Sequence, residues 1–441
     1  MAVLFRHALC ACILFTGFIA PHANAADPIQ TPAPTEGSTS TLTLQTAIRA
    51  ALASNPSLQG FTYEMRAAEA RTLQAGLRPT IEFSTTLENV FGTGENTGLS
   101  AAEATFALSQ VIELGDKRHA RIAAATASRS SIEIERQAAQ LDVLTDVTRR
   151  FITVAERQER LRLNKTATAL AEQTVSATQR RVQAAKSPHA ELDRANIALS
   201  RARLQEQGAV VELETSRLQL AALWGESHTV INGQTFGEIR ADLLTLPETG
   251  DFAELTRRLA QNPDALRFAS EARLRDAELR LAASTRKPDV TLGAGIRRLQ
   301  ASRDQALVAS VSIPLFASQR ADSYVAEAQA KRDLVDSERR VALIKAQATL
   351  FELHQALRHA VAEASTLKEQ MLPKMAEAMK ETEYAFQRGR YSYLELVDAQ
   401  REYLAQQQEL IDASANAHTL RAEIERLTNA PLTNVVTTTA P

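Results

Sequence analysis

Glu395 and Asp398 are the residues whose type and spacing best suit ion chemistry. They are three apart, so on a helix they share one face. They follow a predicted tight turn at 388–391, where Gly389 permits the chain to reverse. Carboxylates repeated around a symmetry axis concentrate cations and resist anions, whereas single ones are ordinary solvated charges. Both readings stay open from the two residues alone.

Other charged residues lie at the two predicted turns. Arg388 and Arg390 flank Gly389 and precede Tyr391, and they either pair with carboxylates of neighbouring hairpins or are plain surface arginines. The matching turn at 186–188 is followed by two further carboxylates that are only two apart, so one of them at most faces the same way. These weaker candidates are Glu191 and Asp193.

The sequence offers no catalytic or metal-binding constellation. His354 and His359 are five apart on a predicted helix, which puts them on different faces. Cys10 and Cys12 both fall in a predicted signal peptide, so the mature chain is expected to have no disulfide and no thiolate ligand. No phosphate-binding glycine loop or HExxH motif is present. We therefore predict no enzyme activity, no metal site and no cofactor.

Residues 1–25 have the pattern of a secretory signal peptide. Arg6 precedes an apolar run from Ala8 to Ala20 and a small-residue site at 23–25, and the run is too short to span a bilayer. The alternative is a short buried helix, and acylation is not expected. The formal net charge of −2 gives no basic field for nucleic acid. Beyond the signal, no apolar stretch approaches the roughly 18 residues of a membrane helix, so any crossing must be made by strands.

The mature chain repeats one arrangement twice. Each half has a lead-in broken by Asn-Pro, at 55–56 and 262–263, then two strands, a very long helix and a return helix. The first half is predicted to span 42–225 and the second 251–428, joined by a linker. The other expected ranges are a disordered linker at 26–41, strands at about 80–91, 101–114, 289–298 and 306–316, helices at about 117–185, 188–224, 320–388 and 391–427, the inter-repeat linker at 226–250 and a disordered tail at 429–441.

The four strands alternate apolar and polar residues. Such an alternation over about ten residues fits a lipid-embedded, water-filled barrel, although a soluble sheet lying on the helices is the competing structure. Four strands cannot close a barrel, because about eight are needed, so several chains must pool their strands. The side chains expected to face lipid are Phe83, Phe106, Val290 and Val311.

The long predicted helices almost lack Gly and Pro, and either would reach roughly 100 Å at 1.5 Å per residue. Helices of that length must pack in a coiled-coil-like array. We expect one packing seam along 141–154 and another at Val341, Ile344 and Phe351. A helical tube below a small barrel follows from these lengths.

The stretch 384–404 (Y-A-F-Q-R-G-R-Y-S-Y-L-E-L-V-D-A-Q-R-E-Y-L), preceded by L-P-K at 372–374, resembles the C-terminal motif of TolC-like outer-membrane efflux proteins. The resemblance covers roughly 42–428 and includes the duplication. It implies a mainly α fold with a transmembrane β-barrel: a homotrimer with a twelve-stranded barrel over a periplasmic α-helical barrel. The location implied is the outer membrane of a Gram-negative bacterium, with a large periplasmic portion.

The stretch 109–118 (S-Q-V-I-E-L-G-D-K-R) is similar to CzcC-type channels of heavy-metal pumps, although Asp116 stands where that subfamily usually has a second glycine. The resemblance implies an exit duct of a tripartite efflux pump for heavy-metal cations. Its expected partners are a periplasmic adaptor (membrane fusion) protein, an inner-membrane pump of the resistance-nodulation-division class and outer-membrane lipid. The wider resemblance to TolC-like proteins also matches Glu395 and Asp398 to carboxylates that line the periplasmic mouth of that family's tunnel. The alternatives are a drug-efflux or type I secretion duct and, from another class, a soluble periplasmic coiled-coil adaptor.

Overall fold

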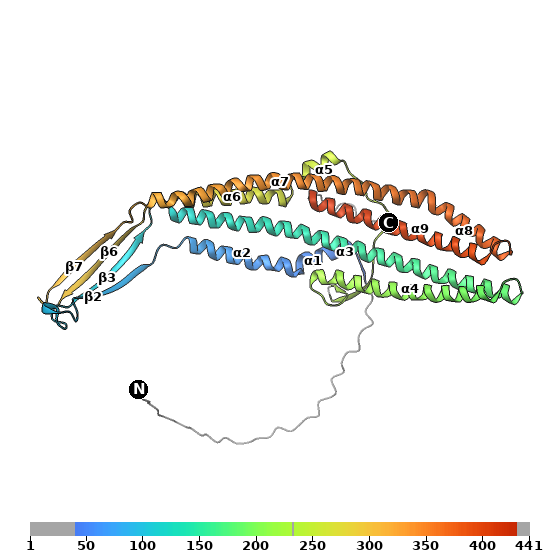
Figure 1. The fold of residues 1–441 in the computed structure, drawn as a ribbon, viewed down its shortest axis with the longest axis horizontal. Coiled ribbons are helices and arrows are strands. Elements are labelled where there is room, and N and C mark those ends of the chain that lie inside the picture. The colour runs from blue at the N-terminus through green and yellow to red at the C-terminus, as the bar shows by residue number, and fades with distance from the viewer. Residues whose placement is uncertain (1–39, 232, 430–441) are drawn as a thin grey trace, which may run out of the picture. The chain divides into compact units, whose positions relative to one another are not determined.

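Long helices make up most of the described chain (Figure 1). The structure, a computed structural model, describes residues 40–231 and 233–429, which belong to one structural unit. The predicted signal peptide at 1–25, most of the predicted linker at 26–41 and the tail from 430 onward lie outside the described residues. The first half contains β1 (Ser40–Leu42), α1 (Leu44–Ser54), α2 (Pro56–Ala75), β2 (Ile81–Glu88), β3 (Glu103–Ile112), α3 (Lys117–Gln183) and α4 (His189–Ala221).

The second half repeats this order with one interruption. Between the halves lie β4 (Val230–Ile231) and β5 (Gln234–Ile239). The second copy then contains α5 (Phe252–Leu259), α6 (Pro263–Ser284), β6 (Val290–Leu299), β7 (Gln305–Ser312), α7 (Ala317–Thr366), the π-helical turn η3 (Leu367–Met371), α8 (Leu372–Gln387) and α9 (Tyr393–Thr428).

The duplicated Asn-Pro breaks are equivalent in structure. The Asn55 side chain accepts from the Ser57 backbone N–H at 2.9 Å, which caps α2, and donates to the Leu223 carbonyl at 2.7 Å. Asn262 caps α6 through the Asp264 N–H at 2.8 Å and donates to the Arg426 carbonyl at 2.7 Å. Each asparagine therefore starts one helix and ties it to the end of the return helix of its own repeat.

The second long helix extends from Ala317 to Gln387, close to the predicted 320–388, but it contains a π-helical turn. It is divided into α7, η3 and α8, and Pro373 stands in the first turn of α8. Proline has no N–H and its ring clashes with the carbonyl four residues earlier, so the regular α-helical hydrogen bonding is interrupted before it. A π-helical turn accommodates the mismatch. The predicted seam of this helix is also largely exposed, with Ile344 69% and Phe351 53% accessible.

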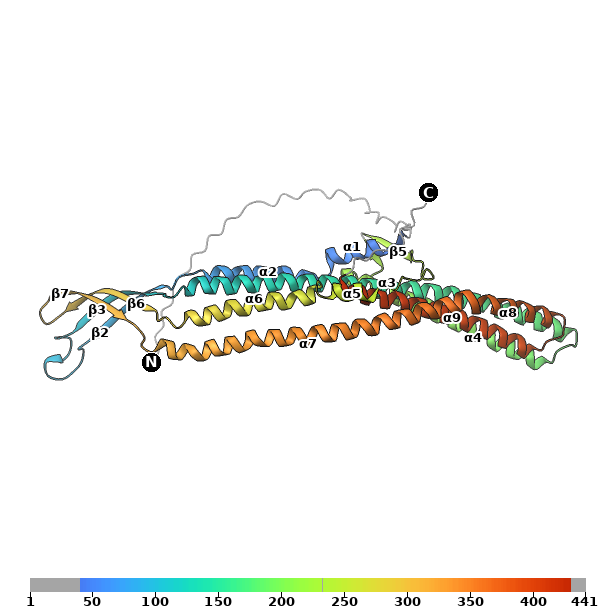
Figure 2. The ribbon, with the colours of Figure 1, turned by 90° about the horizontal axis from the view of Figure 1, so that it is seen from above.

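Four antiparallel strands form a sheet in the order β2-β3-β6-β7, as Figure 1 shows, and Figure 2 gives the same sheet seen from above. The register pairs Phe83 with Leu108, Phe106 with Ile296 and Leu292 with Val311. Because side chains alternate between faces, Phe83, Phe106, Val290 and Val311 all belong to one face. The other face holds the polar positions, among them Ser84, Thr105 and Ser310.

The apolar face of this sheet is exposed, and on the two inner strands it is more exposed than the polar face. Phe83 and Val311 on the outer strands are each 67% accessible, and on β3 Phe106 is 49% accessible whereas Thr105 on the polar face is 7% accessible. A soluble sheet lying on the helices would bury its apolar face, so that alternative does not describe the chain.

The strands end earlier than the sequence predicts. β2 stops at Glu88 instead of about residue 91 because Asn89 and Phe91 have φ values of +56° and +55°. β3 stops at Ile112 instead of about 114, before Gly115 (φ +79°) and Asp116 (φ +58°). Residues in the left-handed region cannot continue a strand. Asp116 stands where the resembled subfamily usually has glycine, and glycine adopts this left-handed conformation without steric cost.

The predicted linker at 226–250 contains ordered strands, which corrects its assignment as a plain linker. β4 pairs with β5, and β5 pairs with β1, so Ser40 and Thr41 also belong to a strand and not to a disordered linker. Phe236 and Ile239 of β5 pack with Leu42 in the largest core cluster, which includes Val147 and Phe151 of α3. Burial of these apolar side chains favours the strand over disorder.

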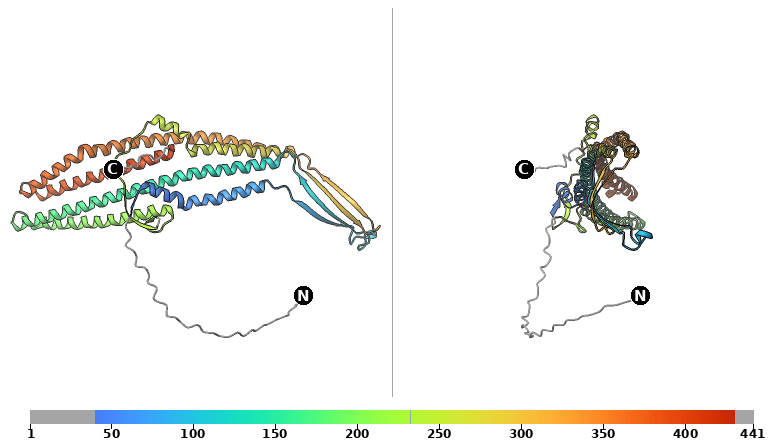
Figure 3. Two further views of the ribbon diagram at one scale, coloured as in Figure 1. Left: turned by 180° about the vertical axis from the view of Figure 1, so that it is seen from behind. Right: turned by 90° about the vertical axis from the view of Figure 1, so that its left-hand side faces the viewer.

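The helices continue the order of the strands. Contacts join α2 to α3, α3 to α6 and α6 to α7, and the sheet lies at the opposite end of the long helices from the two hairpin turns (Figures 1 and 3). α2 and α7, like β2 and β7, are therefore the two edges of the described unit. Among the described residues, no helix is both long and apolar enough to cross a membrane.

Candidate functional site at the hairpin turns

Two helical hairpins reverse side by side at the end remote from the sheet. In the first, α3 ends at Gln183, α4 begins at His189 and Ala185 has φ +57°. In the second, α8 ends at Gln387, α9 begins at Tyr393 and Gly389 has φ +78°. Glycine adopts that conformation without the steric cost that most side chains meet, so Gly389 marks where the second reversal lies. Phe386, Tyr393 and Ala195 share one buried cluster that joins the hairpins.

Glu395 is exposed and forms a capping box with Ser392. Its Oε2 accepts from the Ser392 backbone N–H at 2.7 Å and from the Ser392 hydroxyl at 2.8 Å, while the Glu395 N–H donates to that hydroxyl at 3.4 Å. The backbone hydrogen bond, followed by that from the hydroxyl, lowers the pKa of Glu395. The carboxylate is therefore charged and held at the start of α9.

Asp398 is also exposed and lies one turn further along α9. Its Oδ1 accepts from Nη2 of Arg401 at 3.0 Å. Exposed pairs of this kind are weak, so the Asp398 charge remains available to ions. The structure brings the two predicted carboxylates to the beginning of one helix, close to the turn.

Arg388 and Arg390 have different surroundings. The Arg388 guanidinium lies 5.2 Å from the centroid of the Tyr384 ring, a cation–π contact within its own hairpin. The Arg390 N–H donates to the Ala385 carbonyl at 2.9 Å and helps to close the turn. Within residues 40–231 and 233–429 neither arginine forms an ion pair, so their pairing with a neighbouring hairpin stays a prediction.

The side chains of Glu191 and Asp193 lie in different surroundings, as their spacing of two residues predicts. Asp193 is exposed, whereas Glu191 is half-buried and contributes to the field at the Tyr393 hydroxyl. Burial of Tyr393 raises its pKa, Arg194 opposes this and the Glu191 charge adds to it. Glu191 therefore belongs to the contact between α4 and α9.

Arg181 is a residue of this site that the sequence interpretation missed. Its Nη1 donates to the carbonyls of Phe386, at 3.1 Å, and Tyr391, at 3.2 Å, on the other hairpin. Its guanidinium also lies 4.5 Å from the centroid of the Phe386 ring. A basic residue in the last turn of a helix is common, because it interacts favourably with the helix dipole. The sequence therefore gave no sign that Arg181 also contacts the other hairpin.

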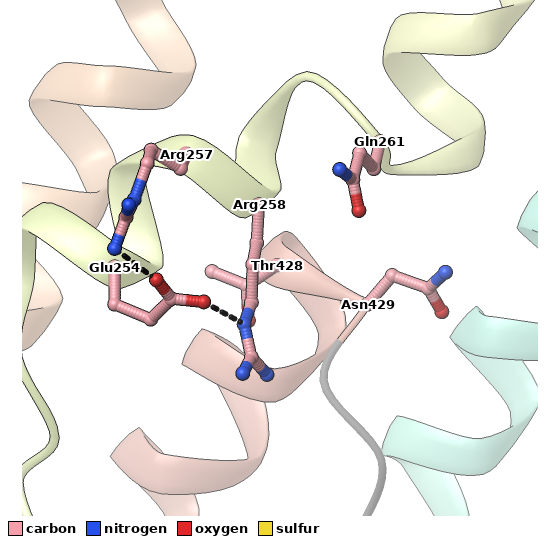
Figure 4. A pocket seen from close by; sticks show the side chains of 6 residues that line it. All are labelled: Glu254, Arg257, Arg258, Gln261, Thr428 and Asn429. Atoms are coloured by element: carbon pink, nitrogen blue, oxygen red, sulfur yellow. Dashed lines mark hydrogen bonds and ion pairs between the residues drawn. The ribbon is translucent and has the colours of Figure 1, made fainter.

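A separate pocket lies elsewhere, where α5 meets the end of α9 (Figure 4). It has a volume of about 530 Å³ and contains Arg257 and Arg258. Glu254 forms ion pairs with both, at 3.1 Å for Arg258. Because the guanidinium groups are already paired, we assign the pocket a structural role. Within the described ranges, no group of three potential metal-ligating side chains gathers.

Comparisons with known proteins agree with this arrangement. The family model "Outer membrane efflux protein" matches residues 47–226 and 255–430. The cobalt-zinc-cadmium resistance protein CzcC of Cupriavidus metallidurans is 29% identical over 362 residues, covering 82% of this chain and 83% of CzcC. The nickel and cobalt resistance protein CnrC of the same species is 27% identical, covering 67% of this chain and 70% of CnrC.

The fold is shared with a solved outer-membrane protein. The crystal structure of VceC from Vibrio cholerae superposes with a TM-score of 0.68 at 18% identity, over 87% of this chain and 95% of VceC. The paired long hairpins and the four-stranded sheet therefore belong to a fold that this chain shares with a solved outer-membrane protein. The chain belongs to the outer membrane efflux protein family, and both halves of its duplication match the family. It is an outer-membrane efflux protein, so the soluble-adaptor alternative is wrong.

Proposed function

We propose that the chain is the outer-membrane exit duct of a tripartite pump that exports heavy-metal cations. The observation that carries the metal assignment is the similarity to CzcC over more than four-fifths of both chains. CnrC, whose name also states metal resistance, supports the same class of cargo. No dedicated metal site is required, because a duct conducts ions best when they bind weakly enough to leave.

The duct is proposed to be a homotrimer with a twelve-stranded barrel. In the single chain the edges of β2 and β7 carry no partner strand among the described residues. On the same edge as β7, Val341 and Ile344 of α7 are 49% and 69% accessible. Two different edges that complement each other give head-to-tail association, which closes into a ring. Three copies supply twelve strands, an even number within the range of outer-membrane barrels.

In this assembly the exposed apolar face of the sheet contacts outer-membrane lipid, and the hairpin turns form the periplasmic mouth. Glu395 and Asp398 would then form rings of three carboxylates that favour cations, with Glu191 and Asp193 in a lesser role. Arg388 and Arg390 would lie at contacts between hairpins, where Gly389 and Tyr391 shape the turn. A periplasmic adaptor and an inner-membrane pump of the resistance-nodulation-division class would complete the machine.

Metal accumulation tests this proposal directly. A host strain that lacks this protein but keeps its pump and adaptor should accumulate cobalt, zinc or cadmium, measured by mass spectrometry of washed cells. Expression of the protein should restore the low level. Unchanged metal content together with increased sensitivity to organic drugs would replace heavy metals with drugs as the cargo.

A further inference from the structure

Arg297 connects three strands on the polar face of the sheet. From β6, its Nε donates to the Thr105 hydroxyl at 2.9 Å and its Nη1 to Glu103 Oε2 at 2.9 Å, both on β3. Its Nη2 lies 3.2 Å from Glu88 Oε2 on β2. The cluster of Arg297, Glu88 and Glu103 lies near the strand ends that are remote from the helices.

The two carboxylates of this cluster are direct neighbours. Glu88 and Glu103 are partners in the antiparallel register, and like charges directly opposite each other repel. The side chain of Glu103 is 21% accessible and that of Glu88 is 47% accessible. One guanidinium therefore balances two carboxylates, and the cluster keeps a net negative charge.

The next residue, Arg298, provides a natural contrast. Its register partners are Ala104 and Gln305, so it belongs to the opposite, apolar face, where it is exposed. The two arginines have the same charge and adjacent positions but opposite faces.

We propose that Arg297 is a specificity-determining residue of the duct: it balances the Glu88–Glu103 pair so that cations pass the outer end without being retained. This inference rests on the proposed function, in which the polar face lines the water-filled barrel. Threefold repetition would bring three such clusters into one confined section, where the charges act on every passing ion. Two carboxylates without the guanidinium form an oxygen-rich pair suited to divalent cations.

The test uses the full-length protein in planar bilayers, with potassium chloride gradients and added zinc ions as the probe. Arg297→Gln should shift the reversal potential toward the potassium equilibrium potential and make the conductance sensitive to zinc. Arg298→Gln, the matched control, should leave both quantities at the wild-type values. Glu103→Gln should shift the reversal potential in the opposite direction.

Arg297→Lys separates the effect of the charge from that of the contacts. Lysine keeps the positive charge, but it cannot make the contacts by which the arginine joins three strands. It should retain near wild-type selectivity and zinc resistance. Equal shifts in the Arg297→Gln and Arg298→Gln variants, or no shift in either, would overturn this role while leaving the channel function intact. A wild-type protein that forms no channels would overturn both the role and the proposed duct.

Discussion

Glu395 has two roles at the residue scale, because the carboxylate proposed to steer cations also caps α9. Removal of the whole side chain would therefore disturb the fold of the turn together with the charge. Glutamine at this position keeps an oxygen that can accept in a capping box, so it separates the two effects. The charge of the mouth can thus be tested without loss of the turn.

We expect the combined Glu395→Gln and Asp398→Asn variant to lose part of its cation selectivity in planar bilayers, because two rings of negative charge disappear. Arg401→Gln, which removes the partner of Asp398 and no carboxylate, should not reduce cation selectivity. Yield and thermal stability of the assembled protein should stay the same in all variants. Unchanged ion selectivity in the double variant would make both residues ordinary surface charges.

Arg181 is expected to restrain the mouth by joining the two hairpins. Arg181→Met removes its donors to the Phe386 and Tyr391 carbonyls and should destabilise the hairpin contact by about 1–3 kcal/mol. The resting single-channel conductance should rise, because the second turn is released from α3. The control is Arg180→Met, which changes an exposed neighbouring arginine. A conductance equal to the wild type in both variants would argue against a restraint.

At the element scale, the two faces of the sheet should respond differently to charge. Phe83→Arg places a charge on the proposed lipid face and should cost about 2–4 kcal/mol near the middle of the bilayer, with less assembled protein in the membrane. Ser84→Arg, one residue away on the polar face, should assemble normally and change the conductance. Equal loss of assembly in the two variants would contradict the face assignment.

Thr105 is not a suitable control for that experiment, although its polar type suggests one. It is 7% accessible and accepts a hydrogen bond from Arg297. An arginine at 105 would meet the positive charge of Arg297, whereas Ser84 is exposed.

The segment 240–251 is an element held by side chains from the helices beneath it. Its carbonyls accept from His418, Lys368 and Arg421 at 3.1, 2.9 and 2.7 Å. Burial, the largest influence, lowers the pKa of His418, and Arg421 acts in the same direction. The hydrogen bonds that His418 donates to the backbone of Leu243 and Thr245, and the charge of Asp242, oppose the shift.

This segment should loosen in acid. A histidine with a lowered pKa in the fold stays neutral while the unfolded chain takes up a proton near pH 6.5, so stability falls as the pH drops below about 6.5. Amide hydrogen exchange at residues 243–245 should therefore quicken between pH 7 and 5, after correction for intrinsic rates. His418→Gln keeps a donor without titrating and should flatten that dependence. A dependence equally steep in the variant would assign it to other groups.

At the scale of the whole molecule, the two sheet edges that carry no partner strand within the described residues predict a closed trimer. Thr86→Cys on β2 and Val308→Cys on β7 place thiols on the polar faces of opposite edges. In the double-cysteine variant, a flexible thiol cross-linker should produce a ladder of gel bands for one, two and three linked copies, and no larger species. Light scattering of the detergent-solubilised protein should also give the mass of three copies. Each single-cysteine variant should give no ladder. A ladder that stops at two, or continues beyond three, would contradict the closed trimer.

The sequence alone determined the features that depend on local spacing. Alternation with a period of two placed Phe83, Phe106, Val290 and Val311 on one face, because consecutive side chains of a strand must point to opposite sides. Gly389 marked the second turn, because few other residues adopt its backbone conformation. The family motif and the duplication supplied the class of protein.

Only the tertiary structure decided which distant residues meet. Arg297 and Thr105 are 192 positions apart, and Arg181 reaches carbonyls more than 200 positions away. Such contacts leave no periodic trace in the sequence. The exposure of Ile344 in the predicted seam could not be read from the sequence either. A helix pattern shows that a face is apolar, but it does not show whether the same chain or another copy covers that face.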